Sequence, residues 1–182
     1  MDIHTPGTLQ LSASVLTIGA LDGIHRGHQA LLLKTKERAE KLKVPFVVYT
    51  FDPPPKVFFK GCQQLMTVEE KLQRLKLLGA DYVIVGSFDE EFMKKEVQEY
   101  IEELQQLNPL EIWEGPNFLF GKNRKGTIEV LSNYFQVGIV EPLICDKGEI
   151  ISSTRIRKLL EQQNDLQAKK LLGEDILHSL SH

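Results

Sequence analysis

Short apolar runs alternate along the chain with longer segments that are apolar on one side only. The runs are rich in β-branched residues, which is typical of buried strands, and they cover residues 16–18, 44–50, 82–85, 111–114 and 137–142. After the first run, side chains recur with the spacing of one helix face at Leu31, Leu32, Thr35 and Ala39. Strand and helix therefore alternate about five times.

This alternation predicts an α/β fold, a Rossmann-like parallel sheet with helices on both faces, because parallel strands need long right-handed crossovers. In such sheets ligands bind in a crevice at the carboxyl ends of the strands. We expect a single domain over residues 1–182, with a core at about 14–162 and a C-terminal helical segment at 163–182. No repeat, low-complexity tract or linker interrupts the pattern.

Local signals place the ends of several elements. Thr67 and Glu70 have the spacing of a capping box and predict a helix that ends near Gly79. The prolines in residues 52–55 stop the second strand and predict a rigid loop, because proline donates no backbone hydrogen bond. Further helices are expected at residues 97–107 and 128–134, from Ser153 or Thr154 onward, and from Asn164 or Asp165 to Gly173.

Composition excludes several classes of function. The net charge is −3, with 22 Lys and Arg against 25 Asp and Glu, so the chain lacks the positive charge of a nucleic-acid binder. No apolar run approaches the roughly 20 residues of a membrane-spanning helix, and residues 1–6 do not resemble a signal peptide. Cys62 and Cys145 are interpreted as structural thiols. We expect a cytoplasmic protein that acts on small molecules.

The first candidate site is residues 19–28, Gly-Ala-Leu-Asp-Gly-Ile-His-Arg-Gly-His, between the first strand and the first helix. Amides at a helix start attract anions, and glycines let the backbone approach a phosphate closely. His25 and His28 can both donate hydrogen bonds to that phosphate. The segment has neither the dinucleotide-binding fingerprint nor the P-loop lysine. A glycine-rich turn with surface histidines is the simpler alternative.

The second candidate is residues 151–157, Ile-Ser-Ser-Thr-Arg-Ile-Arg. Hydroxyl residues at a helix start are usually caps, and a simple cap is the alternative here. Three successive hydroxyls followed by Arg155 and Arg157 exceed what a cap requires. The planar arginine side chain suits phosphate oxygens, and arginine in a first helical turn is unfavourable without an anion nearby.

Together these motifs resemble the HxGH and SSTxxR-type signature of the nucleotidylyltransferase superfamily. The match is closer to the adenylyltransferase (FAD synthetase) module of bacterial bifunctional riboflavin kinase/FAD synthetases, and it runs from about Leu16 to Gly173. Five ordered segments carry it besides the histidine loop: residues 50–53, 66–71, 79–82, 117–121 and 151–157. Pro54 stands where that module usually has a histidine, which bears on flavin binding. The segment that leads into a riboflavin kinase domain begins near Asn164, and we expect no such domain within these residues.

The resemblance implies transfer of AMP from ATP to FMN, giving FAD and pyrophosphate with Mg²⁺. It implies catalytic roles for His25, His28, Asn117 and Arg157. The implied nucleotide-binding residues are Gly19, Asp22, Gly23, Gly27, Ser152, Ser153, Thr154 and Arg157, and the implied flavin-binding residues are Asp52, Pro53, Pro55, Asn117 and Phe118. It assigns no metal ligand and no oligomeric state. The alternatives are a nucleotidylyltransferase with another phosphorylated acceptor, or a non-catalytic flavin- or nucleotide-binding paralogue.

Overall fold

A computed structural model describes residues 1–173 and contains one six-stranded sheet in which every neighbouring pair is parallel. The strand order is β1-β4-β3-β2-β5-β6. The strands are β1 (Asp2–His4), β2 (Ser14–Ile18), β3 (Phe46–Asp52), β4 (Tyr82–Ser87), β5 (Pro109–Glu114) and β6 (Val137–Ile139). The chain leaves β2 toward β3 on one side and later returns to β5 on the other, so the sheet has a switch point between β2 and β5.

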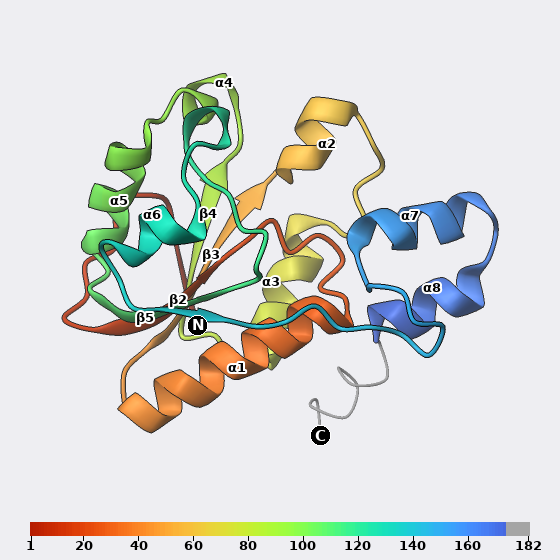
Figure 1. Cartoon of the computed structure of the whole chain (residues 1–182), viewed down its shortest axis with the longest axis horizontal. Helices are drawn as coiled ribbons and strands as arrows, with labels where there is room; N and C mark the ends of the chain where they lie inside the picture. Colours follow the sequence, from red (N-terminus) through yellow and green to blue (C-terminus); the bar gives the residue numbers. More distant parts are fainter. Residues whose placement is uncertain (174–182) are drawn as a thin grey trace.

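Helices connect the strands. They are α1 (Arg26–Leu42), α2 (Pro55–Lys60), α3 (Val68–Leu77), α4 (Glu90–Met93), α5 (Val97–Gln105), α6 (Ile128–Ser132), α7 (Ser153–Glu161) and α8 (Asp165–Leu172), with a 3₁₀ turn at Lys122–Arg124. The α/β fold with helices on both faces is confirmed (Figure 1).

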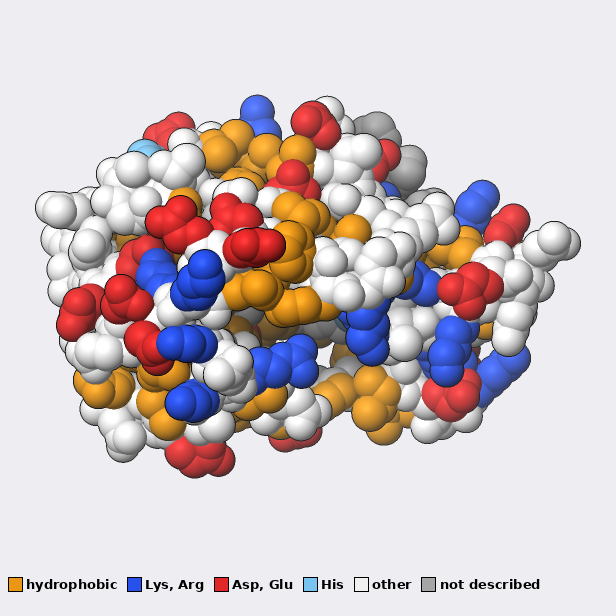
Figure 2. All heavy atoms as spheres, turned by 90° about the horizontal axis from the view of Figure 1, so that it is seen from above, with side chains coloured by type: hydrophobic (Ala, Val, Ile, Leu, Met, Phe, Trp, Pro, Cys, Tyr) orange, Lys and Arg blue, Asp and Glu red, His pale blue; other side chains and the backbone are white. Residues whose placement is uncertain are grey.

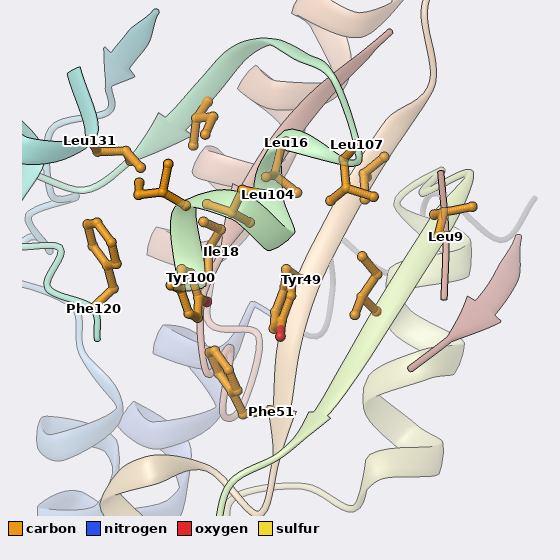
Figure 3. Packing of buried hydrophobic residues seen from close by; sticks show 14 residues of the cluster. Leu9, Leu16, Ile18, Tyr49, Phe51, Tyr100, Leu104, Leu107, Phe120 and Leu131 are labelled. Atoms are coloured by element: carbon orange, nitrogen blue, oxygen red, sulfur yellow. The ribbon is translucent and has the colours of Figure 1, made fainter. Parts of the chain in front are cut away.

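Each face of the sheet has its own apolar core because successive strand side chains point to opposite sides. On one face, Tyr49 and Phe51 of β3 pack with Tyr100 of α5 (Figure 3). On the other face, Val48 of β3 packs with Leu32 of α1 and with Leu75 of α3, as the helical spacing predicts. The pair α7 and α8 lies beside the sheet and buries a small cluster of its own, which includes Ile151, Ile156 and Leu171.

The predicted local signals are largely present. Thr67 and Glu70 form the capping box of α3, with Thr67 Oγ1 accepting from the Glu70 amide at 3.2 Å. Helix α7 begins at Ser153, and α8 has Asn164 as its N-cap and Gly173 as its C-cap. Part of the expected segment at 163–182 lies outside the described residues. No helix within residues 1–173 is long and apolar enough to span a membrane.

The loop that follows β3 is short. It covers residues 53 and 54, and Pro55 begins a short helix, α2, that was not predicted. Proline is well tolerated at the first position of a helix, where its missing amide would have no partner. The N-terminal strand β1, which pairs with β4 at the edge of the sheet, was not predicted at all.

Candidate active site

The candidate site lies at the switch point, where the strands β2 and β5 end. A pocket of about 270 Å³ opens there between the loop after β2, the loop after β5 and the segment after β6. Gly19, Gly27 and His28 line it from the β2 side, and Asn117 and Phe118 line it from the β5 side. The structure therefore brings the predicted histidine loop and the predicted 117–121 segment to one pocket, although they lie far apart in the sequence.

The two histidines sit at the start of α1. His25 is the N-cap residue, and its Nδ1 accepts a hydrogen bond from the His28 backbone amide at 3.3 Å. The two rings are stacked, with centroids 3.7 Å apart. His25 is buried, whereas His28 is half-buried and borders the pocket. Because Nδ1 of His25 is an acceptor, the neutral ring carries its proton on Nε2.

Burial controls the charge of both rings. It lowers the pKa of His25 to about 4, and it lowers the pKa of His28 well below the ordinary value, with the nearby charges of His25 and Lys71 acting in the same direction. Both histidines are therefore neutral at pH 7. The Nδ1 atom of His28 is sealed from solvent and has no hydrogen-bond partner in the described part of the chain. A neutral imidazole can still donate one hydrogen bond to a phosphate.

The backbone of this loop explains its glycines. A Cβ on Gly27 would lie 3.2 Å from the His25 ring, so a larger residue would disturb the stacked histidines. Gly23 has a φ of +86°, and a Cβ there would lie 3.0 Å from Leu65. Ile24 adopts a φ of +37°, which is unusual for a β-branched residue and is held by complete burial.

The 151–157 motif packs directly against the histidine loop. The Ser153 hydroxyl donates to the Asp22 carbonyl at 2.8 Å, and Arg157 Nη2 forms an ion pair with the Asp22 carboxylate. Arg157 Nε also donates to the Gln63 carbonyl at 2.7 Å. Its Nη1 is buried without a partner among residues 1–173. Burial raises the pKa of Asp22, while the amide of Leu65 and the charge of Arg157 oppose that rise.

The other hydroxyls of this motif have different surroundings. Ser152 is the N-cap of α7, and its side chain accepts from the Arg155 amide at 3.3 Å. Ser152 therefore acts as an ordinary helix cap, which was the simpler interpretation of this motif. Thr154 is exposed, and its hydroxyl accepts a hydrogen bond from Lys56 of α2. Helix α2, which follows the proline loop, therefore reaches across to the start of α7.

The predicted flavin residues divide into two groups. Asn117 and Phe118 line the switch-point pocket, whereas Asp52, Pro53 and Pro55 lie at the carboxyl end of β3. Asp52 borders a separate depression of about 450 Å³ before α3. Pro54 is buried at the N-cap of α2.

An exposed aromatic cluster lies beside the proline loop. Phe58 and Phe59 of α2 are 39% and 61% exposed, and both rings meet Phe88 edge-on at 5.7 and 5.6 Å. Apolar side chains gather along the middle of the face shown in Figure 2, beside a hollow with Lys and Arg at its border. This cluster was not predicted, although two adjacent phenylalanines, Phe58 and Phe59, follow closely after the prolines in the sequence.

Glu114, at the end of β5, was also missed. It is 2% exposed, lines the switch-point pocket, and its Oε1 accepts from the Ile18 amide at 2.6 Å. The backbone pairing of β2 with β5 ends at Leu16 and Ile112. Beyond that point the Glu114 carboxyl, in place of a backbone carbonyl of β5, accepts the hydrogen bond from the Ile18 amide. Burial raises the pKa of Glu114 well above its ordinary value, although the bond from Ile18 lowers it.

Two solved structures resemble the fold of this chain. A pantoate-beta-alanine ligase structure from Francisella tularensis superposes with a TM-score of 0.55 at 14% identity, over 88% of this chain and 79% of that one, which concerns the fold alone. A structure described as a macrolide-efflux protein from Streptococcus pneumoniae has a TM-score of 0.83 at 33% identity, over 95% of this chain and 61% of that one.

The chain is a nucleotidyltransferase with an α/β fold, a class that its family match defines. The chain belongs to the FAD synthetase family, whose model matches residues 8–155. A Geobacillus thermodenitrificans protein is 46% identical over 95% of this chain and 97% of its own length. That protein is named as a bifunctional riboflavin kinase/FMN adenylyltransferase. The bifunctional riboflavin kinase/FMN adenylyltransferase of Escherichia coli K12 is 34% identical over 94% of this chain, which spans only 58% of that relative.

Proposed function

We propose that this chain transfers the adenylyl group of ATP to the phosphate of FMN, giving FAD and pyrophosphate. The observation that carries the proposal is the contact between two motifs: the stacked His25 and His28 at the start of α1, and the α7 motif, which Ser153 and Arg157 hold to Asp22 of the same loop. Membership of the FAD synthetase family supports the choice of FMN as acceptor.

In the proposed reaction, an oxygen of the FMN phosphate forms a new bond to the α-phosphorus of ATP. The bond from that phosphorus to the oxygen bridging to the β-phosphate breaks, and pyrophosphate leaves with the electron pair. The attacking phosphate is already ionised, so no side chain needs to remove a proton. Catalysis then depends on alignment and on hydrogen bonds to the charge that develops on the phosphoryl oxygens.

We assign the following roles in this reaction. His28, neutral and facing the pocket, donates a hydrogen bond to the α-phosphate, and His25 fixes its ring by stacking. Gly19, Gly23 and Gly27 let the loop backbone approach the phosphates. Asn117 orients the reacting groups from the opposite wall, and Asp22 holds the loop. The proposed ligands of the β- and γ-phosphates are Ser152, Ser153, Thr154 and Arg157.

The flavin is proposed to bind beyond the α-phosphate, toward the end of β3. Asp52, Pro53 and Pro55 would border it, and Phe118 would approach it from the β5 side. The exposed rings of Phe58 and Phe59 beside this loop suit a large planar aromatic ligand, because aromatic rings pack favourably edge-on or offset.

The described residues contain no cluster of three or more His, Cys, Asp or Glu side chains that could hold a metal ion. Mg²⁺ commonly binds through substrate phosphates and keeps several waters. We propose that it enters with ATP, where it would neutralise phosphate charge, and we assign no protein ligand to it.

Two further expectations accompany this function. The ligands are small molecules and not nucleic acid, in keeping with the net charge of −3. The cytoplasm is the proposed location, because both cysteines are free thiols, as in a reducing compartment.

The test is an acceptor panel with purified protein, ATP and Mg²⁺, in which pyrophosphate release is measured. FMN, riboflavin, nicotinate mononucleotide and phosphopantetheine are supplied one at a time. We expect release with FMN and none with riboflavin, which lacks the attacking phosphate. Release with another acceptor and not with FMN would keep the chemistry and reject FMN as substrate. Binding of ATP without release for any acceptor would indicate a non-catalytic paralogue.

A further inference from the structure

Lys71 of α3 is a lysine with no solvent exposure, which is rare for this residue type. Its Nζ donates to the Ala20 carbonyl at 2.9 Å, to the Phe51 carbonyl at 2.8 Å and to the Thr50 hydroxyl at 3.4 Å. An ammonium group has three hydrogens, so these three acceptors satisfy it completely.

The acceptors belong to the two segments that would carry the two substrates. Ala20 lies in the loop between β2 and α1, which ends at His25 and leads into His28 in the first turn of α1. Phe51 lies in β3 directly before Asp52 and the proline loop. The Thr50 hydroxyl also donates to the Ala20 carbonyl, at 3.3 Å. A single buried ammonium thus connects the proposed nucleotide loop with the end of β3, from which the proposed flavin loop starts.

The charge of Lys71 is also placed to act on the site. Burial lowers its pKa to about 8, while Asp22 and Asp52 oppose this. The charge of Lys71 in turn helps to keep His28 neutral. Asp22, Asp52 and His28 are the titratable groups whose charges act on Lys71 or feel its charge in the described residues.

A purely structural role would be served better by an apolar side chain. Burying an ammonium group carries a large desolvation cost, whereas a side chain such as Leu75, one turn further along α3 and equally buried, stabilises the core directly. The ammonium group of Lys71 offsets this desolvation cost by fixing the spacing of two loops, which a leucine side chain cannot do.

We propose that Lys71 is a positioning residue, whose ammonium group holds the histidine loop and the loop after β3 at the separation that in-line transfer between their substrates requires. This inference rests on the proposed function. It predicts that loss of the ammonium group lowers kcat more than it weakens ATP binding, because misplacement of reacting groups acts mainly on the chemical step.

The experiment compares wild type, Lys71→Met and Lys76→Met in the FMN assay, with calorimetric binding of a non-hydrolysable ATP analogue. Methionine retains much of the length of Lys71 without its charge. Lys76 is an exposed lysine of the same helix and serves as the matched control. For Lys71→Met we expect kcat to fall on the order of 100-fold, with a much smaller change in analogue affinity. Lys76→Met should behave as wild type. An unchanged kcat in folded Lys71→Met would overturn the proposal.

A pH profile gives a second readout that loss of packing would not produce. The wild-type kcat should fall as pH rises through about 8, where Lys71 loses its proton, and Lys71→Met should lack this inflection. Thr50→Val removes one acceptor of the ammonium group and should move the inflection to lower pH, because the charged form is less stabilised. This mild variant decides the matter if Lys71→Met does not fold: an inflection that stays in place overturns the proposal.

Failure of the two proposals can be told apart. If wild type forms no FAD, the proposed function fails and the role of Lys71 falls with it. If wild type forms FAD and Lys71→Met has the same kcat and pH profile, only the inference about Lys71 fails.

Discussion

Arg157 and Asp22 lie 135 positions apart in the sequence and form an ion pair inside the molecule. Their side chains are only 8% and 4% exposed. The pair fastens α7 to the loop between β2 and α1, so the second sequence motif is locked against the first. A charged pair this deeply buried is sensitive to the loss of either partner, because the remaining charge cannot be solvated.

Asp22→Asn should therefore destabilise the fold strongly. The change leaves the buried guanidinium of Arg157 without its counter-charge, and we expect a loss of roughly 3–5 kcal/mol in the free energy of unfolding, measured in urea. Asp146→Asn, at an exposed position, is the control and should have little effect. Equal unfolding free energies for the two variants would show that the pair does not hold the loop.

His28→Ala should strongly reduce turnover while the nucleotide still binds. If His28 donates to charge that grows in the transition state, its loss should lower kcat by about 10²- to 10³-fold. The measurements are FAD formation and affinity for a non-hydrolysable ATP analogue. His4→Ala in the edge strand β1 removes a histidine outside the site and should leave kcat unchanged. A fall in affinity as large as the fall in kcat would mean that His28 binds ground state and transition state alike.

The depressed pKa of His25 makes stability depend on pH. The folded ring has a pKa of about 4, and the unfolded ring takes up a proton near pH 6.5, so the unfolded state binds more protons between these values. Stability is then complete above about pH 6.5 and falls as pH decreases toward 4. Between pH 7 and 5 this group alone should cost roughly 2 kcal/mol.

His25→Asn provides the comparison for that effect. Asparagine is a good N-cap, so it can replace the acceptor of the His28 amide without titrating. Urea unfolding at pH 7 and pH 5 should therefore show a smaller loss for His25→Asn than for wild type. Identical losses would assign the acid sensitivity to other groups.

Glu114 should behave as a neutral hydrogen-bond acceptor. Burial raises its pKa and so favours the protonated carboxyl in the folded state; Glu114→Gln preserves the acceptor for the Ile18 amide without titrating, and its stability relative to wild type should therefore increase as pH rises. Glu114→Ala leaves that amide unpaired and should lose about 1–3 kcal/mol. A Gln variant as unstable as the Ala variant at pH 8 would show that the ionised carboxylate is required.

The sequence predicts the fold well because its signals are local. The apolar runs, the capping box at Thr67 and the glycine C-cap at Gly173 each depend on neighbouring residues, and the structure contains all of them. Helix α2 and strand β1 were not predicted, because their sequences carry no strong local signal. Both are short, and β1 is defined by its pairing with β4, which lies about 80 positions away.

The site was predictable only in part. The histidine loop and the 151–157 motif have dense, unusual compositions, so they are visible in the sequence. Lys71 looks like one exposed lysine among many in an amphipathic helix, and Glu114 looks like the polar end of a strand. Their significance arises from burial against Ala20 and Ile18, which depends on tertiary packing that periodicity does not report.

The most direct test of the central claim follows the phosphates of ATP. Purified protein is incubated with FMN, Mg²⁺ and ATP labelled at either the α- or the γ-phosphate, and the flavin and pyrophosphate products are separated. Adenylyl transfer predicts that the α-label enters FAD and the γ-label appears only in pyrophosphate. A flavin product that carries the γ-label, or no labelled flavin from protein that binds ATP, would contradict the account.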